Sequence, residues 1–194
     1  MKRKKNTKKN TKKSTIASEV MSLDFGSWLV PQILYRPERR EYILKLNPPK
    51  GCVFCLAEKS GSSKESLVVY DSKHSFVVMN KYPYNTGHLL VVPKKHCAHI
   101  EELSSAEFTD FQSLTLTTIK VLKKSFNCAG LNVGMNLGYA AGAGIPDHLH
   151  QHVIPRWVGD MNFLPLVTRS KVMIETLDEV YKRLKPCFEE LANG

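Results

Sequence analysis

Three histidines at alternate positions, His148, His150 and His152, are the residues whose type and spacing are best suited to chemistry. Their alternation with Leu149 and Gln151 predicts a strand over residues 148–153. Side chains alternate across a strand, so we expect the three imidazoles on one face, about 6.5–7 Å apart. A row of imidazoles would make a poor core, and the whole chain contains only seven histidines. The row therefore predicts a functional face rather than a structural one.

Two chemistries are open to aligned imidazoles: metal binding and phosphate transfer. Imidazole is nucleophilic near neutral pH and can form a covalent bond to phosphorus, while a neighbouring histidine holds the phosphate or protonates the leaving group. The segment before the predicted strand, Gly138–Gly144, consists of glycines, alanines and one tyrosine. Such a loop lets backbone N–H groups approach an anion closely. The combination favours phosphate chemistry.

The cysteines include one closely spaced pair, Cys52-x-x-Cys55. The total of five is odd and the chain is not small, which argues against a disulfide framework. The pair could be redox-active, part of a structural metal site, or without function. A redox role is disfavoured because no βαβ pattern surrounds it, and a closed zinc site would need two further N or S ligands. We expect the three single cysteines to be structural: Cys97, Cys128 and Cys187.

The elements that must position these groups follow from hydrophobic periodicity. Short apolar runs predict a hairpin and a third strand, at 66–70, 75–80 and 87–93. A helix with its N-cap at Ser104 or Ser105 and its end at 127–130 follows, and then a strand at 131–136. The segment 56–65 is predicted as a polar loop, and 170–191 as an amphipathic helix of about six turns. This order predicts an α+β domain in which a long helix and a C-terminal helix pack on an antiparallel sheet.

The composition indicates one globular domain behind a basic tail. The chain has 194 residues and a net charge of +10, and eight lysines and arginines within residues 2–13 supply most of that charge. We expect residues 1–20 to be a disordered tail with at most weak affinity for nucleic acid, and residues 21–194 to form the domain. No apolar run reaches the length of a membrane span, and residues 14–34 lack a signal-peptide core. The sequence therefore predicts a cytoplasmic protein.

His148-x-His150-x-His152-Val-Ile-Pro155 resembles the signature of the histidine-triad superfamily of nucleotidyl hydrolases and transferases. A second block, from Asn80 through Gly87-His88 to Pro93, resembles the part of these proteins that binds the nucleoside. The likeness covers about residues 50–160. The surroundings of the triad, including Pro155–Phe163, look most like the diadenosine tetraphosphate phosphorylase branch.

The resemblance implies an enzyme that cleaves dinucleoside polyphosphates such as diadenosine tetraphosphate. His150 would attack the α-phosphorus and carry the nucleotidyl group, and His152 would contact the transferred phosphate or the bridging oxygen. Asn80 would bind the ribose, Asn136 would help to orient the phosphate or the nucleophile, and Ala143 and Gly144 would contact the substrate from the loop. Orthophosphate as acceptor would give ADP and ATP, whereas water would give AMP. A nucleotide-binding protein with low turnover is the third alternative.

Two positions depart from the patterns of the relatives. Many hydrolases of the superfamily have Gln where this chain has Gly144, and the phosphorylase branch tends to have Gly-Ser where this chain has Ala143-Gly144. The missing Gln weakens the hydrolase interpretation, and the missing Ser leaves the acceptor site open. We expect orthophosphate as the acceptor, because small side chains leave backbone N–H groups free to hold an anion.

The resemblance also extends to a metal and to assembly. In relatives such as the galactose-1-phosphate uridylyltransferases, two cysteines, a histidine after a strand that ends in Pro, and the first triad histidine bind zinc. The matching residues here are Cys52, Cys55, His96 and His148. Many relatives are homodimers, so a homodimer is expected. His74, His88 and His99 are expected to have no chemical role, apart from a structural hydrogen bond at His88.

Overall fold

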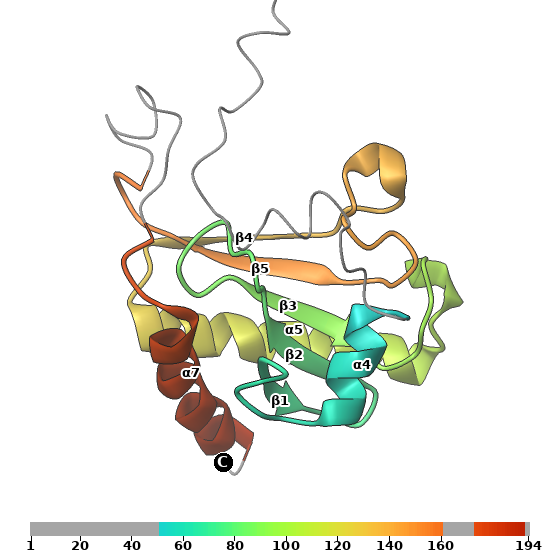
Figure 1. The fold of residues 1–194 in the computed structure, drawn as a ribbon, viewed down its shortest axis with the longest axis horizontal. Coiled ribbons are helices and arrows are strands. Elements are labelled where there is room, and N and C mark those ends of the chain that lie inside the picture. The colour runs from blue at the N-terminus through green and yellow to red at the C-terminus, as the bar shows by residue number, and fades with distance from the viewer. Residues whose placement is uncertain (1–50, 161–172, 193–194) are drawn as a thin grey trace, which may run out of the picture.

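The computed structural model describes residues 51–160 and 173–192. The predicted tail at 1–20 and the segment 21–50 lie outside these residues. These residues form a single five-stranded sheet with three α-helices and two short 3-10 helices (Figure 1). In chain order the elements are α4 (Val53–Ser60), β1 (Val68–Asp71), β2 (Ser75–Met79), β3 (Leu89–Pro93), η1 (Ile100–Glu102), α5 (Ser105–Phe126), β4 (Gly130–Gly134), η2 (Tyr139–Ala141), β5 (Gln151–Arg156) and α7 (Leu177–Ala192).

The sheet has the order β1-β2-β3-β5-β4, and every neighbouring pair is antiparallel. The α+β class and the predicted hairpin are therefore confirmed. β5, the strand that ends the histidine run, lies between β3 and β4, with His152 opposite Leu90 and Gly134. The triad thus borders the middle of the sheet rather than an edge.

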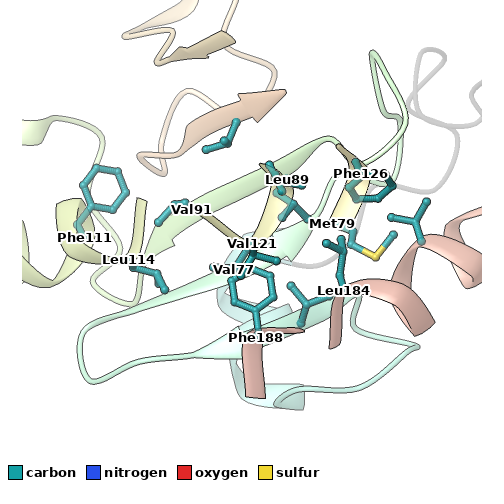
Figure 2. Packing of buried hydrophobic residues seen from close by; sticks show 14 residues of the cluster. Val77, Met79, Leu89, Val91, Phe111, Leu114, Val121, Phe126, Leu184 and Phe188 are labelled. Atoms are coloured by element: carbon teal, nitrogen blue, oxygen red, sulfur yellow. The ribbon is translucent and has the colours of Figure 1, made fainter. Parts of the chain in front are cut away.

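One face of the sheet is covered by α5 and α7, which enclose the larger core (Figure 2). Ser104 caps α5 by accepting from the Glu107 N–H, while Glu107 accepts from the Ser104 N–H, so the predicted helix start is confirmed. Asn127 ends the helix in the left-handed conformation. Alternate strand residues meet the helices. The fully buried residues of this core include Val77, Leu89, Val91 and Val153 from the strands, Phe111 and Leu122 from α5, and Leu184 and Phe188 from α7.

The opposite face carries a smaller cluster under α4, in which Phe54 packs against Val78, Leu90 and Val92. The prediction of a polar loop over 56–65 is wrong in its first half, because α4 runs through Ser60. The segment Leu-Ala-Glu-Lys contains strong helix formers, and Phe54 provides one buried anchor. Sequence composition alone did not reveal this anchor, since Phe54 precedes the polar run.

Several predicted boundaries moved, and those of the first three strands shifted by one or two residues. The strand expected at 148–153 begins only at Gln151, because His148 and Leu149 bond to the segment after β3: the Leu149 N–H donates to the Cys97 carbonyl at 2.7 Å. β4 ends at Gly134, before the predicted Asn136. Thr176 and Glu179 form a reciprocal cap at the start of α7, so the helix begins at Leu177. Among the described residues, no helix is long and apolar enough to cross a membrane.

Candidate nucleotide and metal site

The four residues predicted to bind zinc are brought together from three parts of the chain. Cys52 and Cys55 lie at the start of α4, His96 follows β3, and His148 precedes β5. Their ligand atoms, the two Sγ and one nitrogen from each imidazole, all lie within 4.8 Å of one another. This cluster could hold a metal ion.

Four of the six separations between the ligand atoms are close to those around a tetrahedral ion. A zinc with Zn–S bonds of about 2.3 Å and Zn–N bonds of about 2.0–2.1 Å separates its ligand atoms by about 3.3–3.8 Å. The distances from His148 Nδ1 to Cys52 Sγ, Cys55 Sγ and His96 Nδ1 are 3.2, 3.6 and 3.2 Å, and Cys55 Sγ lies 3.4 Å from His96 Nδ1. Two thiolates with two imidazoles are also a donor set that zinc prefers.

His148 is oriented by its second ring nitrogen. His148 Nε2–H donates to the Pro93 carbonyl at 2.8 Å, because a carbonyl oxygen can only accept. A neutral ring with its proton on Nε2 has a lone pair on Nδ1, which faces the cysteines. Burial lowers the pKa of His148 and favours that neutral form. Phe54 packs edge-on against the ring at 5.4 Å.

His150 has the opposite proton arrangement. Its Nδ1–H donates to the His148 carbonyl at 2.8 Å, so the lone pair of the neutral ring lies on Nε2. The side chain is buried, and burial lowers its pKa. A neutral imidazole with a free Nε2 is the form that can act as a nucleophile.

His152 lies beside His150, with the ring centroids 5.1 Å apart and the planes at 67°. On the other side, His152 Nδ1 lies 2.9 Å from His88 Nε2. The Tyr84 ring stacks on His152 at 5.8 Å and 19°. Burial first, and then the neighbouring His150, lower the pKa of His152 to about 4. The imidazoles of His150 and His152 are therefore both neutral at pH 7.

Asn80 lies in the loop that leads to β3, where its side chain is held by local bonds. Asn80 Oδ1 accepts from the Tyr82 N–H at 2.9 Å, and Asn80 Nδ2 lies 3.3 Å from His88 Nδ1. The far end of the same loop is fixed by Asn85, whose Nδ2 donates to the Pro155 carbonyl at 2.8 Å and to Asp160 at 3.0 Å. The loop and the end of β5 are thus joined near the triad.

The predicted phosphate loop forms a single 3-10 turn, with Gly138 and Gly142 at positive φ values of 79° and 84°. The Ala143 N–H donates to the Gly138 carbonyl at 3.4 Å, a long bond within the loop. Ala143 is buried and Gly144 is exposed, and Asn136 is half-buried just after β4. The roles of these three residues toward a substrate remain predictions.

Sequence reasoning missed three side chains at this site. His88 was expected only to make a structural hydrogen bond, yet it contacts His152 directly. Phe54 packs against His148 and His150, and Tyr84 stacks on His152. The positions of two of them in the sequence could have indicated a place at the site, since Phe54 lies between the paired cysteines and Tyr84 lies in the block that contains Asn80.

Comparison with known proteins gives relatives for this chain. It is 42% identical over 123 residues to an AP-4-A phosphorylase of Mycobacterium tuberculosis, and the match covers 63% of each chain. It is 36% identical over 134 residues to an uncharacterised HIT-like protein of Methanocaldococcus jannaschii, covering 69% of this chain and 98% of the other. The crystal structure of a hypothetical histidine triad nucleotide-binding protein from Sulfolobus tokodaii superposes with a TM-score of 0.58 at 27% identity, covering 72% of this chain and 93% of the other.

The match to the M. tuberculosis protein spans less than two thirds of that relative. The family model described as the HIT domain matches residues 62–158, which include the loop of Asn80, the histidine triad and every strand of the sheet. With this match, the M. jannaschii relative and the shared fold, the chain belongs to the HIT, or histidine-triad, family.

Proposed function

We propose that this protein is a nucleotidyl transferase that cleaves dinucleoside polyphosphates through a covalent nucleotide on His150. The free Nε2 of His150 carries the proposal. Since Nδ1–H is used by the His148 carbonyl, the remaining lone pair is the nucleophile. In the first step the bond from Nε2 to the α-phosphorus forms and the bond from that phosphorus to the polyphosphate leaving group breaks.

The neighbours of His150 fit a phosphate at this nitrogen. His152 lies 5.1 Å away between ring centroids and is close enough to contact the transferred phosphate. In this proposal Asn80 contacts the ribose and Asn136 contacts the phosphate. The S. tokodaii structure, named as nucleotide-binding, supports a nucleotide as the ligand.

Orthophosphate is the proposed acceptor in the second step. From diadenosine tetraphosphate, ATP would leave in the first step, and transfer of the adenylyl group to orthophosphate would form ADP in the second. Gly144 offers backbone rather than a side chain, since the Ala143 N–H is used within the loop. An anion held at Gly144 would compete with water through its high local concentration. The name of the M. tuberculosis relative supports this acceptor. With water as the acceptor, the same covalent intermediate would give AMP.

Zinc is the proposed metal of the four-residue cluster, with a structural role. It would tie α4 to the segment after β3 and to the residues before β5. Assembly as a homodimer is a further proposal, and β4 supports it because the strand pairs only with β5 in the described part of the chain. We also propose that the protein acts in the cytoplasm.

The test is product identity. Full-length protein is incubated with diadenosine tetraphosphate in phosphate-free buffer and in buffer with orthophosphate, and the adenine nucleotides are separated by chromatography. ADP and ATP that form only with orthophosphate are the expected result. AMP at equal rates in both buffers would refute the phosphate acceptor, and binding of the substrate without any product would show a nucleotide-binding protein. Full activity in a folded His150→Ala variant would refute the covalent mechanism.

A further inference from the structure

A chain of hydrogen bonds runs from the Asn80 loop to the last histidine of the triad. His88 Nδ1 lies 3.1 Å from the Tyr84 backbone nitrogen and 3.3 Å from Asn80 Nδ2. A backbone N–H and an amide NH₂ can only donate, so His88 Nδ1 must accept and carries no proton. The single proton of a neutral His88 ring therefore lies on Nε2.

The environment of His88 keeps this ring neutral. The side chain is 2% exposed and lies against the Tyr84 ring at 4.7 Å. Burial first, and then His152 and His150, lower the pKa of His88 to about 3. A charged His88 would need protons on both nitrogens and would lose the bond from the Tyr84 N–H.

The next link determines the proton position on His152. His88 Nε2–H points to His152 Nδ1 at 2.9 Å, so His152 Nδ1 must accept. We propose that His88 is a positioning residue that fixes His152 as the neutral form with its proton on Nε2, so that His152 offers a fixed N–H donor to a phosphoryl oxygen. This role rests on the proposed function, because the substrate of that function brings the phosphoryl oxygen that would accept the hydrogen bond.

The chemistry of such a donor differs from that of an acid. A neutral imidazole N–H stabilises negative charge on oxygen through a hydrogen bond that is already oriented before the substrate arrives. No proton is transferred, since loss of the Nε2 proton would leave an imidazolate. The three triad histidines then differ in role, because Nδ1 of His148 faces the cysteines, Nε2 of His150 attacks, and Nε2–H of His152 donates.

The proton positions can be observed directly, without substrate. Full-length protein labelled with ¹⁵N is studied at pH 7 by long-range ¹H–¹⁵N correlation NMR, in which each histidine tautomer gives its own pattern of nitrogen shifts. The His152 signals are assigned from their absence in His152→Gln. One tautomer with the proton on Nε2 is expected for both His88 and His152. A His152 that is cationic, mixed or protonated on Nδ1 in the wild type would overturn the proposal.

Two substitutions at His88 separate positioning from packing. His88→Gln keeps an N–H donor and a carbonyl acceptor at the end of the side chain, whereas His88→Phe keeps a ring of similar size without either. We expect both His152 tautomers to be populated in His88→Phe, with kcat for diadenosine tetraphosphate at least about tenfold lower, the effect of losing one oriented donor. His88→Gln should restore the single tautomer and most of kcat. Equal losses in the two variants, with an unchanged tautomer, would assign His88 a purely structural role and overturn the proposal.

A double substitution provides the remaining control. If His88 acts through His152, it has nothing left to position once His152 is replaced. Adding His88→Phe to His152→Phe should therefore change kcat less than about twofold. If the loss of kcat in the double variant equals the product of the losses in the two single variants, the proposal is contradicted. If His88→Phe does not fold, the wild-type spectrum and the His88→Gln variant still show whether His88 fixes the His152 tautomer. A fixed tautomer in a protein that does not turn over dinucleoside polyphosphates would refute the proposed function and leave the tautomer assignment intact.

Discussion

Gly87 allows a quantitative test of how the Asn80 loop packs against the core. Its φ is +74°, a conformation that favours glycine. A Cβ added there would lie 3.0 and 3.1 Å from two ring atoms of Phe126 and 3.2 Å from Pro155 Cγ. Gly87→Ala therefore combines backbone strain with overpacking, directly before His88.

Gly61 is the matched control, since it has a similar φ of +68° but no atom within 4 Å of the added Cβ. Both alanines carry the left-handed strain, about 1–2 kcal/mol, which the smaller entropy of the unfolded chain offsets in part. Only Gly87→Ala adds an overpacking term of about 1–3 kcal/mol, because Phe126 and Pro155 are ring side chains that move little. We expect a loss of about 2–4 kcal/mol for Gly87→Ala and about 1 kcal/mol for Gly61→Ala.

Urea unfolding followed by circular dichroism measures the two losses. With a slope of about 2 kcal/mol per molar urea, a difference of about 2 kcal/mol separates the two midpoints by about 1 M. Equal unfolding free energies for the two variants would show that the contact between the loop and Phe126 is looser than the structure indicates. The placement of His88 against His152 would then need revision as well.

Three further predictions concern the triad and the metal. His150→Asn should lower turnover of diadenosine tetraphosphate by several orders of magnitude, with an unchanged circular dichroism spectrum, because the nucleophile is lost. Metal analysis should find about one zinc per chain, and less than about a tenth of that in Cys52→Ser/Cys55→Ser, which should also unfold at lower temperature; equal zinc in both would exclude the site. His88 is neutral when folded but titrates near pH 6.5 when unfolded, so the unfolded state binds more protons and stability falls as pH falls from about 6.5 toward 3. The slope in that window should be smaller by up to about 1.4 kcal/mol per pH unit in His88→Gln, and an identical slope would contradict the buried neutral ring.

The fold was predictable where local patterns and tertiary packing agree. The helix capped by Ser104 follows from periodicity and capping chemistry, because its buried residues recur at the helical period. The hairpin follows from two short apolar runs with turn residues between them, and its second strand is buried throughout. α4 was missed, since Phe54 is its one buried residue and its second half runs into the polar segment that continues to residue 65. The late start of β5 was missed for a similar reason: the His148 and Leu149 backbone and side-chain bonds are made to residues 93–97, far away in sequence.

The candidate site was predictable in its residue types and only partly in its contacts. Spacing singled out the triad and the cysteine pair, and the resemblance added His96, which the structure places in the same cluster. The contact between His88 and His152 could not be inferred from the sequence, because it depends on the register between β3 and β5. Nothing local in the Gly87-His88 dipeptide indicates which side chain lies opposite.

One backbone carbonyl, that of His148, joins the proposed metal cluster to the proposed nucleophile, so histidines two residues apart could serve different chemistry. The His148 ring is held between Pro93 and the cysteines, and the carbonyl of the same residue accepts the Nδ1–H of His150. A metal that fixes the His148 ring would also fix that carbonyl, and with it the proton position on His150. Loss of the metal should therefore lower kcat as well as stability, while a substitution that loosens α4 away from the cluster should lower stability alone. Ala57→Gly is such a control, because Ala57 lies on α4, packs against the smaller cluster and supplies no ligand atom, and glycine weakens a helix by about 1 kcal/mol relative to alanine.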